Sequence, residues 1–274
     1  MVRIAACQLS LNIEDTEYCV SQALDSISQA ISNNAEIIVL PELSTSGYCF
    51  QNINEVQTSS QSIGGEFVVK CVQLAKANDV VIVAGMNIEN DSKYWNASIV
   101  IDNSGIVGWY AKAHLFGDEG NFFTPGDKAP LVVNTSKGRI ATMICYDIEF
   151  SEWVRLAMLQ GAQLLALPTN WPEIGQTKTS PPMEVIRVQA AASQNKLVIA
   201  AADRCTTERG QNWVSSSVIT NFEGVIEALA DSTINSKTQI IYAEVELPID
   251  TSITDKNDVR KDRRPSLYSS ILDK

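Results

Sequence analysis

The chain has 274 residues, of which 45% are hydrophobic and 19% are charged, and its mean hydropathy is −0.02. This composition is typical of a globular protein and excludes a largely disordered chain. The formal net charge of −11 argues against a nucleic-acid partner, because nucleic acids are held by Lys and Arg side chains that neutralise phosphates.

The first third of the chain predicts two units of helix and strand. Residues 2–8 alternate in polarity and predict a strand, residues 15–32 carry apolar side chains at helical spacing, and residues 36–40 form a short apolar strand. A second helix is expected over residues 65–77, followed by a strand over residues 80–86. The chain therefore opens with a β-α-β unit that is then extended.

Two strands and a long loop come next. Residues 95–101 and 105–110 predict successive strands joined by an Asp-Asn-Ser-Gly turn. Residues 115–130 contain three glycines and predict a polar loop. Loops of this length inside a compact domain often carry function.

The second half of the chain repeats the alternation of strands and helices. In chain order we expect strands at 139–145, 163–167 and 197–202, helices at 151–160 and 182–194, and three closing strands at 215–220, 224–229 and 239–245. Two such stretches, each followed by paired strands, predict an α/β fold: a four-layer α-β-β-α sandwich of two mixed sheets with outer helices. A single doubly wound sheet is the alternative.

The domain organisation is predicted to be simple. No linker divides the chain, so we expect residues 1–274 to form a single domain. Residues 248–274 are polar and predict a C-terminal tail that lies on the surface or on a subunit partner.

Membrane association is not indicated. No apolar stretch approaches the roughly 20 residues that span a bilayer, and the first residues do not resemble a signal peptide. The six cysteines form no C-x-x-C pair, which argues against a zinc ribbon or a redox dithiol. We therefore expect a cytoplasmic protein in a reducing compartment, with no membrane partner.

Three expected strands end next to a reactive side chain. Glu42 follows the apolar run that ends at Leu40, Lys112 follows the strand that ends at Tyr110, and Cys145 closes the run that ends at Ile144. Active sites of open α/β sheets gather at strand ends. Each of these side chains taken alone has an ordinary structural role: a packed thiol, a surface acid and a solvated lysine.

A cysteine nucleophile needs help, because only a few per cent of a free thiol is ionised at neutral pH. A neighbouring Lys112 favours the thiolate, and Glu42 can take the proton. The single histidine, His114, leaves a Cys145/His114 pair as the second possibility.

Acidic residues close to the thiol in sequence argue against its ionisation. Asp147, Glu149 and Glu152 would raise the thiol pKa if they lay near it in space. They would instead stabilise the following helix if they faced its N-terminus.

Six motifs occur along the chain in a defined order and spacing. They are Leu-Pro-Glu-Leu at 40–43 with Ser-Gly-Tyr at 46–48, Tyr-Ala-Lys-Ala-His-Leu at 110–115, Glu119 with Phe-Thr-Pro-Gly-Asp at 123–127, Ile-Cys-Tyr-Asp at 144–147 with Phe150, Leu-Pro-Thr-Asn-Trp-Pro at 167–172, and Asp-Arg-Arg-Pro-Ser-Leu-Tyr at 262–268. Together they resemble the nitrilase superfamily of carbon–nitrogen hydrolases, and the similarity covers nearly the whole chain.

This resemblance implies a Glu-Lys-Cys triad with a second glutamate. Glu42 would be the general base and Cys145 the nucleophile, while Lys112 and the Tyr146 backbone N–H would stabilise the oxyanion. Glu119 would hold Lys112 and the leaving or attacking group. The reaction would pass through a thioester and would need no metal or organic cofactor.

The resemblance also implies pocket residues. Tyr48, Asn170 and Trp171 would line the acyl pocket, with core packing as an equal alternative for the aromatic side chains. Phe122 and Phe123, from the long loop, would cover the site or belong to the core.

The region around the nucleophile looks most like bacterial aliphatic amidases, including 5-aminopentanamidase and stereoselective carboxamide amidases. This implies a small-molecule amide as substrate, with an N-carbamoyl amine or amino acid as the second possibility and a nitrile as the third. A non-catalytic binding or scaffold protein on the same fold is the alternative from another class. Relatives of this kind pair through the helix at 151–160 and the tail, which implies a homodimer or higher homo-oligomer.

Overall fold

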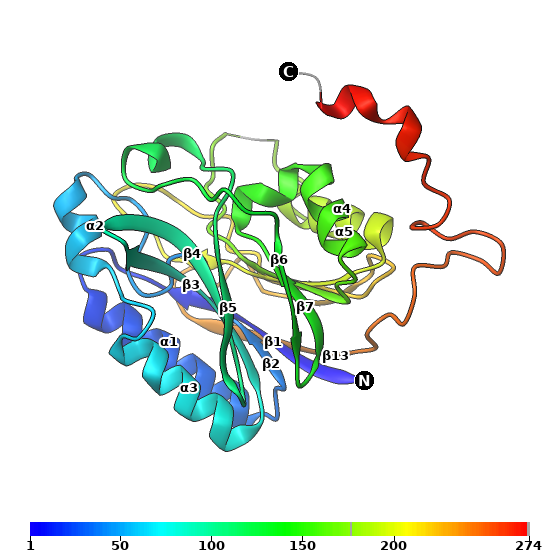
Figure 1. The fold of residues 1–274 in the computed structure, drawn as a ribbon. Helices are drawn as coiled ribbons and strands as arrows, with labels where there is room; N and C mark the ends of the chain where they lie inside the picture. The colour runs from blue at the N-terminus through cyan, green and yellow to red at the C-terminus, as the bar shows by residue number, and fades with distance from the viewer. Residues whose placement is uncertain (176, 273–274) are drawn as a thin grey trace.

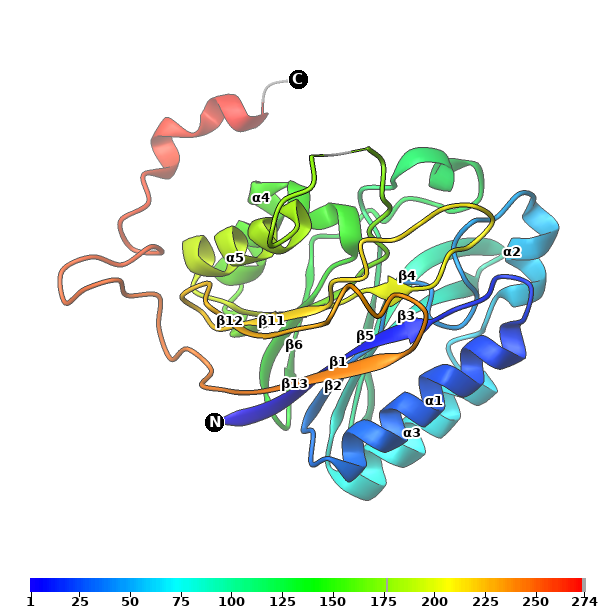
Figure 2. The ribbon, with the colours of Figure 1, turned by 180° about the vertical axis from the view of Figure 1, so that it is seen from behind.

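Two β-sheets pack face to face in the computed structural model, and a pair of helices covers the outer face of each sheet (Figures 1 and 2). The structure describes residues 1–175 and 177–272. The arrangement is the expected α-β-β-α sandwich, and the alternative of one doubly wound sheet is wrong. Residues 273–274 of the predicted tail lie outside the described part.

The first sheet has the strand order β10-β1-β2-β3-β4-β5, with β13 also paired to β1. It is mixed, because β1, β2 and β3 are parallel while β4, β5 and β13 join antiparallel neighbours. Its strands are β1 (Val2–Ser10), β2 (Ile37–Val39), β3 (Val81–Asn90), β4 (Lys93–Asp102), β5 (Gly105–Ala111), β10 (Arg204–Cys205) and β13 (Gln239–Val245).

The second sheet has the strand order β12-β11-β9-β8-β7-β6. Its centre, β7 to β9, is parallel, and its outer strands are antiparallel. The strands are β6 (Leu131–Thr135), β7 (Gly138–Thr142), β8 (Leu164–Pro168), β9 (Val198–Ala202), β11 (Val218–Thr220) and β12 (Ile226–Leu229).

Two helix pairs form the outer layers. Helices α1 (Thr16–Ser32) and α3 (Glu66–Asn78) cover the first sheet, and α4 (Ser151–Leu159) and α5 (Met183–Asn195) cover the second. The Asp15 side chain starts α1 by accepting a hydrogen bond from the Tyr18 N–H at 2.9 Å.

The remaining helical segments are short. They are α2 (Ile53–Ser59) and the 3₁₀ turns η1 (Gly117–Asn121), η2 (Cys145–Glu149), η3 (Pro265–Leu267) and η4 (Ser269–Leu272). The sequence did not indicate α2, β6 or β10. It also placed the end of the strand before the nucleophile at residue 145, whereas β7 ends at Thr142.

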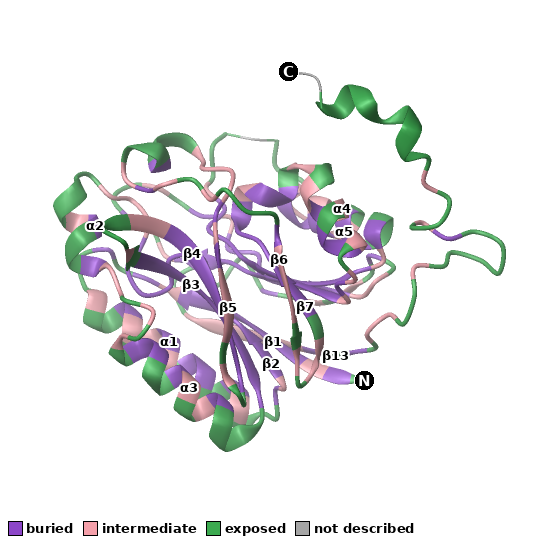
Figure 3. Cartoon of the chain, in the orientation of Figure 1, coloured by how far each residue is buried: buried purple, intermediate pink, exposed green. Residues whose placement is uncertain are grey.

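Alternation along each strand divides the core into three layers, because successive side chains point to opposite faces. In β1, Ile4 and Ala6 face the second sheet, while Ala5 and Cys7 face the helices. Figure 3 shows the consequence: buried strands at the centre and helices exposed on one side only.

The C-terminal segment runs away from the body of the fold and is largely exposed (Figures 1 and 3). Ile249 is 93% exposed and Leu272 is 85% exposed. Within the described residues, no helix is both long and apolar enough to cross a bilayer.

Candidate active site

The ends of β2, β5 and β7 bring Glu42, Lys112 and Cys145 into one buried cluster. Lys112 Nζ lies 2.7 Å from Glu42 Oε1 and 2.7 Å from Glu119 Oε1. Both Glu42 and Lys112 are fully buried, and Glu119 and Cys145 are nearly so. The two strands that carry Glu42 and Lys112 belong to the first sheet, whereas β7 belongs to the second.

The lysine is held as a cation between two carboxylates. Burial lowers the pKa of Lys112, but the charges of Glu42 and Glu119 raise it above the ordinary value. A buried charge is stable only when it is paired and hydrogen-bonded, and both conditions are met here.

The two carboxylate oxygens of Glu42 differ in their hydrogen bonding. Oε1 accepts hydrogen bonds from Lys112 Nζ and from Asn96 Nδ2 at 2.6 Å. Oε2 is buried and has no hydrogen-bond partner among the described residues. Burial raises the pKa of Glu42 to about 7, against the opposing charge of Lys112. A carboxylate with these properties is suited to accept a proton near neutral pH.

The turn that carries Glu42 is fixed against β3. Ser44 N–H and Ser44 Oγ both donate to the Gly85 carbonyl at 2.8 Å. A Cβ atom at Gly85 would lie 2.4 Å from the Pro41 carbonyl oxygen and 2.6 Å from Glu42 Cα. Only glycine therefore allows this close approach of the two backbones.

Cys145 occupies a strained turn at the start of η2. Its backbone has φ of +44°, in the left-handed region that a non-glycine residue rarely adopts. Its Sγ lies 3.7 Å from the Asn170 carbonyl oxygen. Burial raises the thiol pKa well above the ordinary value, Glu42 raises it further, and Lys112 lowers it. The thiol at rest is therefore neutral.

The acidic residues near Cys145 in the sequence lie in three different environments. Asp147 is buried and accepts hydrogen bonds from Tyr110 OH at 2.8 Å and from the Ile144 N–H at 3.0 Å. Glu149 pairs with Arg187 at 3.1 Å, and Glu152 is exposed on α4. The carboxylate that contributes most to the raised thiol pKa is Glu42.

His114 is engaged on the far side of Asp147. Its Nδ1 lies 2.7 Å from Asp147 Oδ1, and its ring stacks on Phe150 with centroids 3.7 Å apart. Trp153 packs edge-on against the same ring. This environment favours Glu42, rather than His114, as the proton acceptor for the thiol.

The residues expected to bind the substrate do not all line the same cavity. Tyr146 and Trp171 line a cavity of about 250 Å³ together with Cys145. Tyr48 donates a hydrogen bond through its OH to Glu119 Oε1 and lines an adjacent cavity of about 390 Å³. Asn170 is fully buried, and its side-chain amide donates to the Glu42 carbonyl at 2.9 Å.

Phe122 and Phe123 lie in a small apolar cluster beside the site. Phe123 is buried with Leu43 and Val56, and Phe122 packs against them from the long loop. Both also line the cavity next to Glu119. The two aromatic side chains therefore belong to an apolar cluster and also form part of the cavity wall next to Glu119.

A second layer of residues, which the sequence did not indicate, lies behind Tyr48. Glu208 Oε2 accepts from the backbone N–H groups of Tyr48 and Cys49 at 2.8 and 2.7 Å, and its Oε1 pairs with buried Arg204 at 2.7 Å. Trp213 lies between, edge-on to Tyr48 and under the Arg204 guanidinium. These contacts fix the loop that presents Tyr48 to Glu119.

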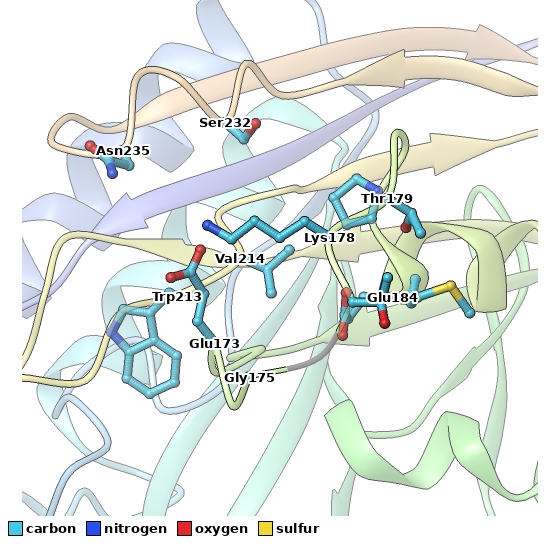
Figure 4. Close-up of a pocket in the computed structure, with 12 residues that line it drawn as sticks. Glu173, Gly175, Lys178, Thr179, Glu184, Trp213, Val214, Ser232 and Asn235 are labelled. Carbon is cyan, nitrogen blue, oxygen red and sulfur yellow. The ribbon is translucent and has the colours of Figure 1, made fainter.

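A further cavity of about 460 Å³ shares Glu184 with the cavity that Cys145 lines. It is formed mainly by the loop between β8 and α5, from which Lys178 projects (Figure 4). Within the described residues, no group of three or more His, Cys, Asp or Glu side chains is arranged to hold a metal ion.

Comparison with known proteins gives one consistent result. A "Nitrilase" from Pyrococcus abyssi is 32% identical over 98% of this chain and 99% of its own length. A "Citrullinase" from Francisella tularensis is 29% identical over 100% and 99%. An "N-carbamoylputrescine amidase" from rice, Oryza sativa, is 27% identical over 99% and 94%.

Solved structures agree at the level of the fold. An amidase from Nesterenkonia sp. AN1 has a TM-score of 0.79 at 23% identity, over 99% of this chain and 100% of that chain. The sequence model described as "Carbon-nitrogen hydrolase" matches residues 3–249. The chain therefore belongs to the carbon–nitrogen hydrolase family, within the nitrilase superfamily.

Proposed function

We propose that this protein is an amidase, which hydrolyses a small carboxamide to a carboxylate and ammonia through a thioester on Cys145. The observation that carries the proposal is the bridge of Lys112 between Glu42 and Glu119 beside a thiol that opens into a cavity. A scaffold protein would have no need to bury a lysine and two carboxylates next to an accessible thiol, because burial of charge is costly.

The first half of the reaction forms the thioester. Sγ of Cys145 attacks the amide carbonyl carbon while the thiol proton passes to Glu42, through the open Oε2. The carbonyl oxygen gains the electron pair and is stabilised by Lys112 Nζ and the Tyr146 N–H. Collapse of this intermediate breaks the carbon–nitrogen bond, and the leaving nitrogen takes the proton from Glu42 and departs as ammonia.

The second half releases the acid. A water molecule gives a proton to Glu42 and attacks the thioester carbonyl carbon. The carbon–sulfur bond then breaks, the sulfur takes the proton back from Glu42, and the product leaves as a carboxylic acid, which gives its own proton to solvent or to the released ammonia. Glu119 keeps Lys112 aimed at the oxyanion through both halves, and Tyr48 orients Glu119.

Ammonia release from a panel of carboxamides and carbamoyl compounds tests this proposal. We expect release from short carboxamides and a loss on the order of 10⁴-fold or more in Cys145→Ala, because the nucleophile forms the covalent bond. A trapped acyl group should appear by mass spectrometry on the peptide that contains Cys145. Silence across the panel by a folded protein, or an acyl group on another residue, would contradict the proposal.

A carbamoyl substrate is the second candidate. Relatives described as a citrullinase and an N-carbamoylputrescine amidase favour its inclusion. The same panel separates the two, because hydrolysis of a carbamoyl group releases carbon dioxide as well as ammonia, whereas a carboxamide leaves a stable acid.

We also propose that the protein acts in the cytoplasm as a homodimer or higher homo-oligomer. All six cysteines are free, which suits a reducing compartment. A groove of about 1040 Å³ lies between α4 and the C-terminal segment, with Leu156, Tyr268 and Ile271 in its lining. An apolar groove of this kind is suited to cover by a second copy.

A further inference from the structure

The Asp147 carboxylate lies between the end of β5 and the turn that follows β7. Its Oδ2 accepts hydrogen bonds from Tyr110 OH at 2.8 Å and from the Ile144 N–H at 3.0 Å. Its Oδ1 accepts one from the His114 backbone N–H at 3.0 Å and lies 2.7 Å from His114 Nδ1. A carboxylate has about four lone-pair positions, so these contacts use its full capacity to accept hydrogen bonds.

These hydrogen bonds reach both sides of the proposed catalytic centre. Tyr110 and His114 lie two positions before and two positions after Lys112. Ile144 directly precedes Cys145. Because β5 belongs to the first sheet and β7 to the second, one carboxylate links the segment that carries the lysine to the turn that carries the nucleophile.

The Tyr110 hydroxyl is fixed as a donor to Asp147. Burial raises its pKa well above the ordinary value, and the Asp147 charge raises it further, so the hydroxyl keeps its proton. The same oxygen accepts hydrogen bonds from the Ala113 N–H at 3.2 Å and from Trp153 Nε1 at 3.0 Å. With both acceptor positions used, its remaining hydrogen bond is the one it donates to the carboxylate.

His114 supplies a second side-chain donor. An ionised carboxylate accepts hydrogen bonds but cannot donate them, so the ring nitrogen Nδ1 carries the proton that faces Asp147. The ring stacks on Phe150 with centroids 3.7 Å apart and meets Trp153 edge-on at 5.0 Å. These contacts fix the plane of the ring and therefore the direction in which Nδ1 donates.

The turn that carries Cys145 needs such support. Its φ of +44° lies in a region where a non-glycine residue persists only when the surrounding structure holds it there. The Asp147 N–H donates to the Ile144 carbonyl at 3.0 Å, and the Ile144 N–H donates to the Asp147 side chain. Main chain and side chain of one residue thus close the turn around the nucleophile.

Asp147 acts at a distance from the substrate. It is fully buried, and among the described residues that line the cavity of about 250 Å³, Cys145 is present and Asp147 is not. Any effect of its carboxylate on the reaction must therefore pass through the residues it holds.

We propose that Asp147 is a positioning residue, which fixes Cys145 against Lys112 by joining the nucleophile's turn to both flanks of the lysine. The inference rests on the proposed amidase function, because it concerns the approach of the thiol and the oxyanion-binding lysine to one carbonyl group. A displacement of about 1 Å between reacting groups can cost on the order of 100-fold in rate.

Asp147→Asn breaks the link with little change in side-chain size. One acceptor oxygen becomes an NH₂ group that faces donors, so hydrogen bonds on one side are lost. With the best substrate of the carboxamide panel, we expect kcat to fall on the order of 100-fold and KM to stay within about threefold, because the cavity wall is unchanged. Ammonia release measures both constants.

Tyr110→Phe is the second variant. It keeps the carboxylate and removes one donor, so we expect a smaller fall in kcat, on the order of 10-fold. Because the charge of Asp147 is retained, this variant decides the question if Asp147→Asn does not fold. An unchanged kcat in folded Tyr110→Phe would then overturn the proposal.

Two substitutions of His114 separate its hydrogen bond from its other properties. The side-chain nitrogen of asparagine takes nearly the position of Nδ1, so His114→Asn should keep kcat within about threefold, whereas His114→Leu should lose on the order of 10-fold. Rescue by a side chain that cannot titrate also excludes His114 as the base. A loss in His114→Asn as large as that in Cys145→Ala would contradict the positioning role.

Ser98→Ala is the matched control. Ser98 Oγ lies 2.7 Å from Thr142 Oγ1 in a buried contact that also joins the two sheets, and Ser98 pairs with Tyr110 in the register of β4 and β5. This link ends at Thr142, before the turn at residues 144–147. We expect kcat within about twofold of the unaltered protein, because the reacting groups stay in place. Thermal unfolding of each variant separates a loss of folded protein from a loss of rate.

The outcomes distinguish the positioning role from the amidase function. If the unaltered protein releases ammonia from no carboxamide, the amidase function is wrong and the positioning role falls with it. If the unaltered protein is active, the positioning role alone is wrong when folded Asp147→Asn keeps its kcat, when Ser98→Ala loses as much, or when His114→Asn and His114→Leu lose equally.

Discussion

The protonation states of Cys145 and Glu42 determine the resting state of the site. Burial raises the pKa of both groups. The thiol pKa lies well above its ordinary value, so the thiol is neutral, and the pKa of Glu42 is about 7. A permanently ionised thiol is therefore not the source of reactivity. In the proposed mechanism, the thiolate forms when the proton moves to Glu42 as the thiol attacks.

The first prediction concerns pH. A carboxyl group must be ionised to accept a proton, and burial raises the folded-state pKa of Glu42 from 4.5 to about 7. We expect kcat/KM to fall as pH decreases through about 7, by about tenfold per unit below it. A pH–rate profile measures this. An acidic limb centred near 4.5 would contradict the assignment of Glu42 as the base.

The second prediction concerns Lys112. Lys112→Met leaves two buried carboxylates without their cation, so we expect a loss of about 3 kcal/mol in the free energy of unfolding. Activity should fall on the order of 1,000-fold, because an oxyanion donor is lost. Urea unfolding and ammonia release measure the two effects.

Lys70→Met is the control for this variant. Its Nζ lies 2.7 Å from Glu66 Oε1, the same separation as in the buried pair, but both side chains are exposed. The expected loss is below about 1 kcal/mol. Equal losses in the free energy of unfolding for Lys112→Met and Lys70→Met would show that burial does not strengthen the interaction between lysine and carboxylate.

At the scale of elements, the close approach of β3 to the turn after β2 fixes the position of Glu42, the proposed general base. The Gly85 carbonyl accepts both donors of Ser44, and the absence of a side chain at Gly85 lets the Pro41–Glu42 backbone lie against the strand. The position of the carboxylate thus depends on a residue in another strand that carries no reactive group.

The third prediction follows from this contact. Gly85→Ala places a methyl group within 2.4 Å of the Pro41 carbonyl oxygen, so the turn must shift. We expect a loss of about 1–3 kcal/mol in the free energy of unfolding and a fall in kcat on the order of 10-fold to 100-fold. Gly64→Ala is the control, since its Cβ meets nothing within 4 Å. Comparable kcat values in the two variants would contradict the argument.

The main strands and helices were predictable because their periodicity is strong. The elements that were missed lack such a signal: α2 buries only Val56 and Ser59, and β6 is a half-exposed edge strand. The prediction that the strand before Cys145 extends to residue 145 was wrong, because the apolar run continues into the turn. Apolar periodicity does not report the left-handed backbone at Cys145.

The candidate triad of Glu42, Lys112 and Cys145 could be predicted from the sequence only through its motifs, and the residues that hold it in place could not be predicted. Asn96 reaches Glu42 from 54 positions away, and Glu208 reaches Tyr48 from 160 positions away. Neither lies in a local pattern that marks its role. Such pairings depend on strand order, which periodicity does not determine.

At the scale of the molecule, a large and mainly apolar groove lies between α4 and the C-terminal segment. The C-terminal segment extends from the body, and α4 presents Leu156, which is 38% exposed, to the groove between them. The outer helices α1 and α3 are buried on the side toward the sheet and exposed on the other (Figure 3).

The fourth prediction tests the proposed dimer. We expect light scattering to give a mass of at least twice the 29.9 kDa of the chain. Leu156→Glu should shift this mass toward the monomer, because it places a charge in a buried contact. Val69→Glu, at a 46% exposed position on α3 in the opposite layer, should leave it unchanged. A monomeric mass for the unaltered protein would refute the dimer.

The lysine between two carboxylates also bears on how a catalytic cycle ends. One cation and two anions give the centre an excess negative charge whenever Glu42 is ionised. An uncharged amide group enters without repulsion, but the acid formed from it is an anion next to Glu42 and Glu119. The proposed reaction thus converts an uncharged group into one that the site repels, and we expect the carboxylate product to be a weak inhibitor.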